Sequence, residues 1–287
     1  MAILLTGGKG KTSSRLGRIL KDAKIPFIMT SRRGDSGFSD DLPVAKFDLT
    51  DESTYKGPFQ HSSLKGEKIS AIYLVLPETA DPVTPSIAFI NYAVGKHGVK
   101  RFVVLSGTTA AKGGPMVGKI WEHLARMDVE YSVLKASWIM ENFSEWQYPG
   151  TIKNQDKIYT ACKDGRIPFI SAEDIAAVAF HALTDAEVPG EAVRVLGPEL
   201  LTYDEAAAKF SQALGREIVH VRLNEEQNIQ QYKSLGLDEA TARFMTWLEV
   251  NTSGGSEAMT NDIVERITGR PPKTLDVYIQ ETKAAWQ

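Results

Sequence analysis

The sequence predicts a doubly wound α/β protein, in which a Rossmann-like parallel sheet is joined to a smaller α-rich C-terminal lobe. Short apolar runs alternate with helical patterns in the first half of the 287-residue chain, as is typical of βαβ units with a sheet covered on both faces. A glycine-rich turn from Gly7 to Gly10 follows the first run directly. After Lys135 the alternation stops and helical patterns dominate.

Six apolar runs are the predicted strands of the sheet. They are Ala2 to Thr6, Pro26 to Ser31, Val44 to Phe47, Ile69 to Leu76, Arg101 to Ser106 and Tyr131 to Lys135. Between them lie three segments with helical spacing, each long enough to connect parallel strands: Thr12 to Ala23, Thr84 to His97 and Pro115 to Met127. Right-handed crossovers then build a Rossmann-like sheet.

The rest of the chain is expected to form a second lobe. We place a nucleotide-binding domain over residues 1–150 and a mainly substrate-binding lobe over 151–287, whose strands are free to return to the main sheet. The predicted elements of this part are a helix from about Ser171, a short strand at Val193 to Leu196, a helix after the capping box Thr202/Glu205, and three helical stretches between Asn224 and Trp286.

Composition excludes several classes of function. The chain is 43% hydrophobic and 24% charged with a net charge of -3, so it offers no basic field for nucleic acid. Its single cysteine, Cys162, has no partner for a disulfide or a structural zinc site, and we expect no metal. No apolar run approaches the roughly 18 residues of a membrane span, and the N-terminal segment is too short for a signal peptide. We expect a cytoplasmic protein.

The glycine turn predicts a site for a dinucleotide phosphate. Strand, turn and helix start follow one another within thirteen residues of the N-terminus, and the spacing Gly7-x-x-Gly10-x-x-Ser13 is the looser form used by short-chain dehydrogenases. Glycines permit close approach of the backbone, and amides at a helix N-terminus hold phosphate. The predicted binding residues are Gly7, Gly8, Lys9, Gly10, Lys11 and Thr12. The alternative is an ordinary βα turn with solvated lysines.

The end of the second predicted strand indicates which nucleotide binds. NAD enzymes place a carboxylate there, on the ribose 2′-hydroxyl, whereas this chain has Ser31 and Arg32. An arginine forks onto a 2′-phosphate, so NADPH/NADP+ is favoured, unless Arg32 and Arg33 are simply solvated. Three further residues belong to the predicted cofactor site. Asp48 is expected to accept from the adenine amino group or to cap a turn, and Leu76 and Pro77 to form an apolar wall.

Longer stretches make the chain similar to a known family. They read LLTGGKGKT, IPFIMTSR, VKRFVVLS, KGGPMVGKIWEHL, WIMENFS, KIYTACKDGRIPFISAEDIAAVAF and LGPELLTYDEAA. In these stretches the chain resembles the NmrA-like atypical short-chain reductases, especially the festuclavine and agroclavine synthases of fungal ergot alkaloid biosynthesis. The resemblance implies NADPH-dependent reduction of a cyclic iminium in a prenylated indole alkaloid. Two departures from the family pattern, Lys135-Ala136 and Trp121, lie near the presumed pocket and leave the substrate open.

Two other functions stay open. One is an NADP(H)-dependent cyclase that holds a reactive azadiene folded for a [4+2] Diels-Alder closure, by proximity and orientation. The other is a regulator that senses NADP(H) without chemistry, as some NmrA-like proteins do. In either case the partner is a small molecule, neither nucleic acid nor membrane is expected, and the chain is a monomer or a homodimer.

The usual proton donor of short-chain dehydrogenases is missing. Those enzymes carry Tyr-x-x-x-Lys on the helix after the fifth strand, but here Pro115 stands four residues before Lys119. The spacing recurs at Tyr92, Tyr131 and Tyr159, in positions that we interpret as chance matches. An iminium needs only a hydride, so the absence agrees with iminium reduction or with no chemistry. Lys119 and Ser106 are the candidate catalytic residues, with Lys119 also placed on the nicotinamide ribose, whereas His123 is expected to be structural.

Aromatic residues predict the substrate pocket. The segment from Trp138 to Tyr148 begins where the sixth strand leaves the sheet, at the edge where ligands bind in open α/β sheets. Aromatic faces pack a planar indole and stabilise a cation. The candidate substrate-binding residues are Trp121, Trp138, Met140 and Asn142, with Pro168 and Phe169 brought over the nicotinamide. Met245 and Trp247 either close this pocket or, at their helical spacing, pack in a core.

Overall fold

The computed structural model describes residues 1–34 and 41–287. The chain divides into two compact units, each assembled from two stretches of sequence. The first unit contains residues 1–136 and 172–195, and the second contains residues 137–171 and 196–287. The chain therefore leaves the first unit after Ala136 and returns to it for one helix and one strand, whereas the sequence placed a single division near residue 150.

A parallel sheet forms the centre of the first unit, as the sequence predicts, and it has seven strands where six apolar runs were expected. Its order is β3-β2-β1-β4-β5-β6-β9, so neighbouring connections change direction between β1 and β4, where ligands bind in folds of this kind. The strands are β1 (Ala2–Leu5), β2 (Phe27–Ser31), β3 (Val44–Lys46), β4 (Ile69–Leu74), β5 (Arg101–Gly107), β6 (Glu130–Ala136) and β9 (Ala192–Val195). The inner strands are apolar because helices cover both faces.

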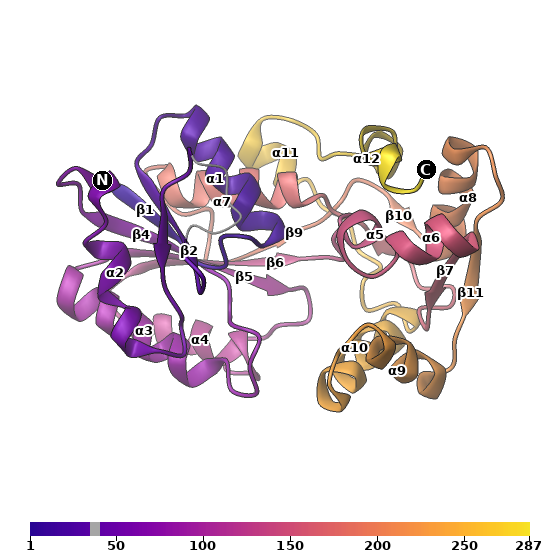
Figure 1. Ribbon diagram of the computed structural model, residues 1–287, viewed down its shortest axis with the longest axis horizontal. Coiled ribbons are helices and arrows are strands. Elements are labelled where there is room, and N and C mark those ends of the chain that lie inside the picture. The colour runs from indigo at the N-terminus through magenta and orange to yellow at the C-terminus, as the bar shows by residue number, and fades with distance from the viewer. Residues whose placement is uncertain (35–40) are drawn as a thin grey trace. The chain divides into compact units, whose positions relative to one another are not determined.

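Helices cover both faces of this sheet (Figure 1). On one face α1 (Lys11–Asp22) packs against α7 (Ala172–Thr184). The other face carries α2 (Lys56–Phe59), α3 (Val83–His97) and α4 (Val117–Leu124), with the short 3₁₀ turns η1 (Glu52–Thr54) and η2 (Ser62–Leu64) beside them. The core between these layers contains Leu4, Ile72, Phe89 and Val104, none of which is exposed.

The predicted bounds in the first unit shift by up to three residues, and two of these shifts have a clear physical reason. The fourth strand ends at Leu74, two residues earlier than predicted, because Val75 already hydrogen-bonds through its amide to the Thr6 hydroxyl at 2.7 Å. The helix after β5 begins at Val117, not at Pro115. Met116 has a positive φ of 51°, which no helix accommodates, and the preceding loop folds back so that the Gly113 amide donates to the Gly118 carbonyl at 2.9 Å.

The strand predicted at Val193 to Leu196 belongs to the main sheet. As β9 it runs parallel to β6, with Leu134 opposite Val193 and Ala136 opposite Val195. The alternating burial of its residues shows why, because Val193 and Val195 face the core while Ala192 and Arg194 face solvent.

The second unit is built from short elements. Its helices are α5 (Asn142–Glu145), α6 (Pro149–Gln155), α8 (Tyr203–Leu214), α9 (Glu225–Ser234), α10 (Glu239–Ser253), α11 (Ile263–Thr268), α12 (Leu275–Thr282) and the 3₁₀ turn η3 (Lys283–Ala285). Its strands form two pairs, β7 (Lys157–Thr160) with β11 (Val219–Arg222), and β8 (Ile167–Pro168) with β10 (Leu200–Leu201). The capping box predicted at Thr202 and Glu205 is present at the start of α8.

The core of the second unit is aromatic. Phe143, Phe169, Tyr203 and Phe210 pack ring against ring with Trp286 at the end of the chain. The Trp286 indole nitrogen donates to the Phe143 carbonyl at 2.7 Å, which holds the C-terminus in this core.

Candidate functional site

The glycine turn lies at the carboxyl end of β1, beside the point where the sheet changes direction. Gly7 has a positive φ of 62°, which a residue with a side chain rarely adopts. Gly10 cannot be enlarged either, because a Cβ on it would lie 2.9 Å from the Gly7 carbonyl oxygen. Both glycines are needed to bring the chain directly from β1 into α1, so the turn is a built feature.

The amides of this turn are not all available to a ligand. Gly8 donates to the Thr30 carbonyl at 3.0 Å and Gly10 donates to the Gly7 carbonyl at 2.7 Å, so these two positions shape the loop. Thr12 and Ser13 lie in the first turn of α1, where the helix offers no carbonyl to their amides. No acidic residue occupies this turn, so the helix N-terminus presents a positive end to an anion.

A buried hydroxyl network braces the turn from below. Ser13, completely buried, donates to the Thr6 carbonyl at 2.7 Å. The Thr12 hydroxyl accepts from Tyr73 at 3.0 Å, so this side chain points inward and only its backbone faces the loop. Thr6 and Tyr73 were missed from the sequence. The signal for Thr6 was a hydroxyl in an otherwise apolar strand, directly before the glycine turn.

Ser31 and Arg32 lie at the carboxyl end of β2, the neighbouring strand. The Ser31 hydroxyl accepts from the Arg33 amide at 3.2 Å and holds the turn that follows. Arg32 is exposed and, among the described residues, makes no hydrogen bond or ion pair. Its guanidinium is therefore available beside the glycine turn, which suits a phosphate group on the ribose.

Three other predicted cofactor residues follow the neighbouring strands β3 and β4. The Asp48 carboxylate accepts from the amide and the hydroxyl of Thr50, at 2.9 and 2.8 Å, so it caps a turn after β3. Both contacts end on the same oxygen of Asp48. Contact of its other carboxylate oxygen with the adenine amino group stays a prediction. Leu76 and Pro77 are half-buried and lie just beyond the end of β4.

The candidate catalytic residues lie on neighbouring elements at the same edge. Ser106 is near the carboxyl end of β5, level with Lys135 of β6, and is half-buried. Lys119 is on the first turns of α4 and is exposed. His123, one turn later, hydrogen-bonds to Asn91 of α3 at 2.8 Å, as expected for a structural histidine. Trp121 packs onto the core of the first unit, and its indole nitrogen is buried with no partner among the described residues.

None of the three tyrosines with Tyr-x-x-x-Lys spacing lies on α4. Tyr92 is near the end of α3 and packs with Phe59 and His97, toward the amino end of the sheet. Tyr131 is at the start of β6, and Tyr159 is on β7 of the second unit, where its hydroxyl donates to Gln155 at 2.9 Å. The geometry agrees with interpreting all three as chance matches.

The predicted pocket residues of the second unit divide into two groups. Trp138 is half-buried and its indole nitrogen donates to the Thr252 hydroxyl at 3.3 Å, and Asn142 begins α5. Met140 and Phe169, in contrast, have side chains inside the aromatic core, with Pro168 buried in β8. The side chains of these three residues therefore help to fill the second unit, and their contact with a ligand stays a prediction.

A buried carboxylate in the second unit was not found from the sequence. Glu249 of α10 is completely buried. One of its oxygens accepts from the Tyr232 hydroxyl at 2.7 Å and from the Gln147 amide at 3.3 Å, and the other from the Ala161 backbone amide at 2.6 Å and the Asn228 amide at 2.9 Å. Burial raises the pKa of this carboxyl, against the effect of its four donors. A single glutamate in a helical pattern carries no such signal.

A second buried polar group joins α8 to the strands of this unit. His220 of β11 hydrogen-bonds to the Asp204 carboxylate at 2.7 Å and to the Thr160 hydroxyl at 2.8 Å. Burial lowers the pKa of His220, while Asp204 opposes that effect. The order of groups resembles a nucleophilic triad, but Thr160 is fully buried and also accepts from the Cys162 amide at 3.1 Å. This group is structural.

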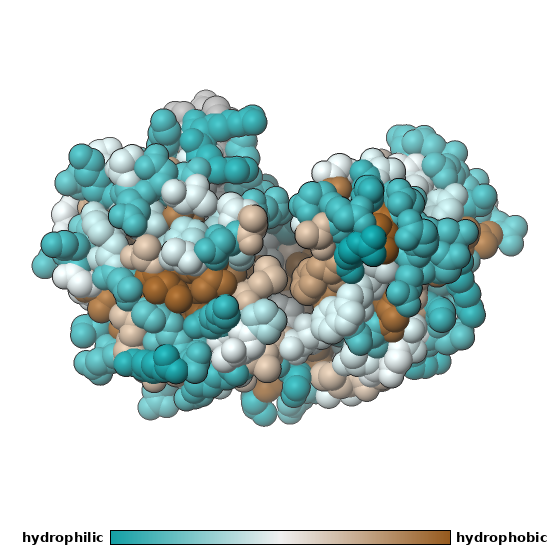
Figure 2. Space-filling model, turned by 90° about the horizontal axis from the view of Figure 1, so that it is seen from below, coloured by the Kyte–Doolittle hydropathy of each residue, from teal (hydrophilic) through white to brown (hydrophobic). Residues whose placement is uncertain are grey.

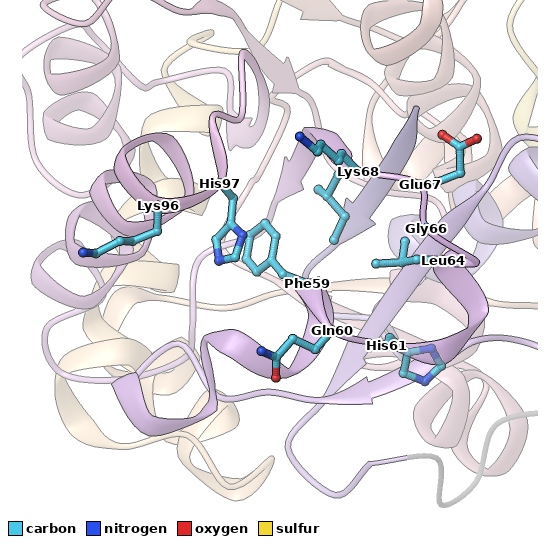
Figure 3. A pocket seen from close by; sticks show the side chains of 10 residues that line it. Phe59, Gln60, His61, Leu64, Gly66, Glu67, Lys68, Lys96 and His97 are labelled. Atoms are coloured by element: carbon cyan, nitrogen blue, oxygen red, sulfur yellow. The ribbon is translucent and has the colours of Figure 1, made fainter.

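A pocket of about 420 Å³ lies in the first unit, away from the glycine turn (Figure 3). It is lined by Phe59, Ile69, Lys68 and His97, among others, and therefore lies at the amino end of β4 and the last turn of α3. Phe59 and His97 stack in it with ring centroids 3.8 Å apart. Since ligands of open α/β sheets bind at the carboxyl ends of the strands, this pocket is separate from the candidate site.

Two classes of feature are not found in the part of the chain that the structure describes. No helix there has the length and apolar character that crossing a membrane requires. No three His, Cys, Asp or Glu side chains within the same residues are grouped as a metal site requires.

Comparison with known proteins gives full-length relatives. The chain is 40% identical over 289 residues to the agroclavine dehydrogenase of Claviceps fusiformis, covering 100% of this chain and 99% of that protein. It is 39% identical over 290 residues to the festuclavine dehydrogenase easG of Aspergillus fumigatus, again covering 100% and 99%. No protein-family model matches the chain.

Solved structures support the fold. A nucleoside-diphosphate-sugar epimerase of Staphylococcus aureus has a TM-score of 0.80 at 18% identity, covering 98% of this chain and 100% of that one. An NADPH-dependent quinone oxidoreductase of Escherichia coli, solved with NADPH, has a TM-score of 0.79 at 21% identity, covering 97% and 99%. The Rossmann-like architecture predicted from the sequence is thus confirmed, with its helical C-terminal part.

Proposed function

The chain belongs to the family of the fungal agroclavine and festuclavine dehydrogenases and is an oxidoreductase; from this premise we propose that it uses NADPH to reduce an iminium in a prenylated indole alkaloid. The observation that carries the proposal is the 40% identity, which extends over the whole of both chains. Both units therefore have counterparts in those relatives.

We assign NADP(H) as the cofactor from the residues around the glycine turn. The first turn of α1 offers amides and the positive end of the helix to the pyrophosphate. Arg32 is exposed at the end of β2 without a partner among the described residues, at the position where a carboxylate would select NAD. In this proposal Gly7, Lys9, Lys11 and Thr12 hold the phosphates, and Gly8 and Gly10 shape the loop through their own backbone hydrogen bonds.

Reduction of an iminium requires the protein mainly to position the two reactants and to stabilise a positive charge. When bound, NADPH supplies the hydride that the iminium carbon accepts, and the product is a neutral amine. No proton has to be delivered, which fits a helix α4 that carries Lys119 but no tyrosine four residues before it. Lys119 orients the nicotinamide ribose and Ser106 contacts nicotinamide or substrate at the end of β5. Trp138 and Asn142 provide the start of the substrate surface.

The rival functions use the same nucleotide site differently. In a cyclase, the pocket folds a reactive azadiene for [4+2] closure and no net reduction occurs; in a regulator, binding has no chemical consequence. Neither has an observation of its own in the described residues. A cytoplasmic location and a monomeric or homodimeric state stay predictions.

Deuterium transfer distinguishes the three functions. The enzyme is incubated with NADPH that carries deuterium on the transferred face and with the cyclic iminium that precedes festuclavine or agroclavine. We expect one deuterium at the former iminium carbon and one NADPH oxidised for each product formed. Polycyclic product with far less than one NADPH consumed, or with NADP+ alone, would support the cyclase instead. Binding of NADPH without product from any indole alkaloid would support the regulator.

A further inference from the structure

Two aromatic side chains are exposed together on one helix of the second unit. Among the described residues the large hydrophobic side chains that face solvent are Met1, Met116, Val219, Phe244, Trp247 and Val277. Phe244 and Trp247 are 42% and 52% exposed, lie three positions apart on α10, and stack with centroids 6.0 Å apart and ring planes 19° apart. Trp247 therefore does not pack in a core, although its helical spacing allowed that. Most of the surface in Figure 2 is hydrophilic, with separate hydrophobic patches.

The opposite face of α10 holds this pair in place. Ala242, Thr246, Glu249 and Thr252 are buried on that face, which at 3.6 residues per turn is turned away from Phe244 and Trp247. The Glu249 carboxylate accepts its four hydrogen bonds there, from α9, from the segment after β7 and from Gln147. The stacked rings are thus presented by a helix whose position is over-determined, as a preformed binding surface requires.

The same helix lies along the aromatic segment that was predicted to line the pocket. Trp138 donates to the hydroxyl of Thr252, and Gln147 donates to Glu249. Trp146, which precedes Gln147 in this segment, stacks against Tyr232 with ring centroids 6.2 Å apart. Met245 of α10 packs on the small apolar cluster that contains Tyr232. The contacts to Thr252 and Glu249 lie on the buried face of α10, so they fix the helix that presents the two rings.

Charge favours a cationic ligand on the second unit. Its sequence has 13 Lys and Arg against 18 Asp and Glu, a net charge of -5, whereas the first unit has 20 against 18, a net charge of +2. The cations nearest the rings in sequence, Arg243 and Lys233, both pair with Glu239, at 2.6 and 2.7 Å. The first unit therefore suits an anionic nucleotide, and the second unit suits a cation.

We propose that Phe244 and Trp247 form a stacking platform for the planar, cationic ring system of the substrate, a polycyclic indole with a positively charged nitrogen. The faces of the two rings supply apolar contact and attract the cation. This inference rests on the proposed function and adds the surface that recognises its substrate.

Equilibrium binding tests the platform without turnover. The probe is an N-methylated β-carbolinium, a tricyclic indole cation that the enzyme is given with NADP+, and its fluorescence is titrated against wild type and four variants. We expect Trp247→Ala to weaken binding about tenfold and Phe244→Ala about threefold, with Trp247→Phe closer to wild type. Val277→Ala, which trims an equally exposed side chain on α12, is the matched control and leaves binding unchanged. Neutral carbazole binds more weakly than the cation.

Four results would overturn the platform: a wild type that does not bind the cation, equal affinity in wild type and Trp247→Ala, no preference for the cation over carbazole, or a change in molecular mass by light scattering in Trp247→Ala with probe binding intact. The last result assigns the rings to an interface between copies.

Turnover separates this inference from the proposed function. Loss of probe binding in the variants, with no alkaloid reduced by wild type, defeats only the proposed function. Reduction with an unchanged KM in Trp247→Ala defeats only the platform.

Discussion

The two units bury very different kinds of polar group. Among the described residues of the first unit, the buried polar side chains are hydroxyls such as Thr6, Ser13 and Thr30, with Asp174 as the exception. The second unit buries Glu141, Glu249, Glu257 and His220, together with the amides of Gln147 and Asn228. A buried hydroxyl can donate its hydrogen bond to a nearby backbone carbonyl of the sheet. A buried carboxylate requires several hydrogen-bond donors, which here come from different elements.

The difference follows from what each unit has to position. A parallel sheet with apolar strands aligns its own loops, so the glycine turn needs only short braces from Ser13 and Thr12. The second unit has two pairs of short strands and no large sheet that could align its helices. Directional hydrogen bonds to Glu249 and His220 perform that task, at the cost of desolvating charged or polar groups.

The largest expected effect is the loss of the Glu249 carboxylate. Glu249→Ala leaves four buried donors without an acceptor, so we expect the second unit to lose about 3–5 kcal/mol of stability in urea unfolding. Glu239→Ala, on the exposed face of the same helix, is the control and should shift the urea midpoint only slightly, because solvent screens its ion pairs. If the comparison holds, NADPH still binds to the first unit under conditions where the second is unfolded. A single transition that abolishes NADPH binding at the same urea concentration would contradict the separate roles.

A change at the nucleotide site should leave the second unit intact. Arg32→Ala removes a charge-assisted contact to a 2′-phosphate, so NADPH affinity should fall by about 1.5–3 kcal/mol while NADH affinity is almost unchanged. Two calorimetric titrations measure this, with Arg33→Ala as the neighbouring control. Equal affinity of the wild type for both nucleotides would remove the assignment of NADP(H).

The smallest expected effect is a dependence of stability on pH that originates in the second unit. Because burial raises the pKa of Glu249 in the folded state, its stabilising contribution is complete below its ordinary value near 4.5 and is lost as the pH rises through the folded value. Glu249→Gln cannot ionise, so the stability of wild type relative to this variant should decline as the pH is raised from 4 to 8. Unfolding free energies of both proteins across that range test the sign. A relative stability of wild type that increases with pH would show that the four donors outweigh burial.

The fold and the candidate nucleotide-binding residues could be predicted from the sequence. Strand runs, crossover lengths and the glycine turn are local patterns, and a parallel βαβ order leaves few topologies once they are recognised. Gly7 and Gly10 were recognisable because side-chain-bearing residues rarely adopt the positive φ of Gly7, and a Cβ on Gly10 would lie 2.9 Å from a backbone oxygen. Ser31 and Arg32 follow from their place at a strand end. The full-length relatives then confirm the family that the longer motifs indicated.

Tertiary structure decided which side chains of the second unit face inward. Met140 and Phe169 were predicted as ligand contacts from their positions in the sequence, and the structure buries both side chains in the aromatic core. Trp247 had the spacing of a core residue, yet lies on the outer face of α10, because Glu249 turns the opposite face inward. Periodicity gives the faces of a helix but not which neighbour each face meets. That depends on partners such as Ala161, Asn228 and Gln147, which lie 21 to 102 positions away along the chain.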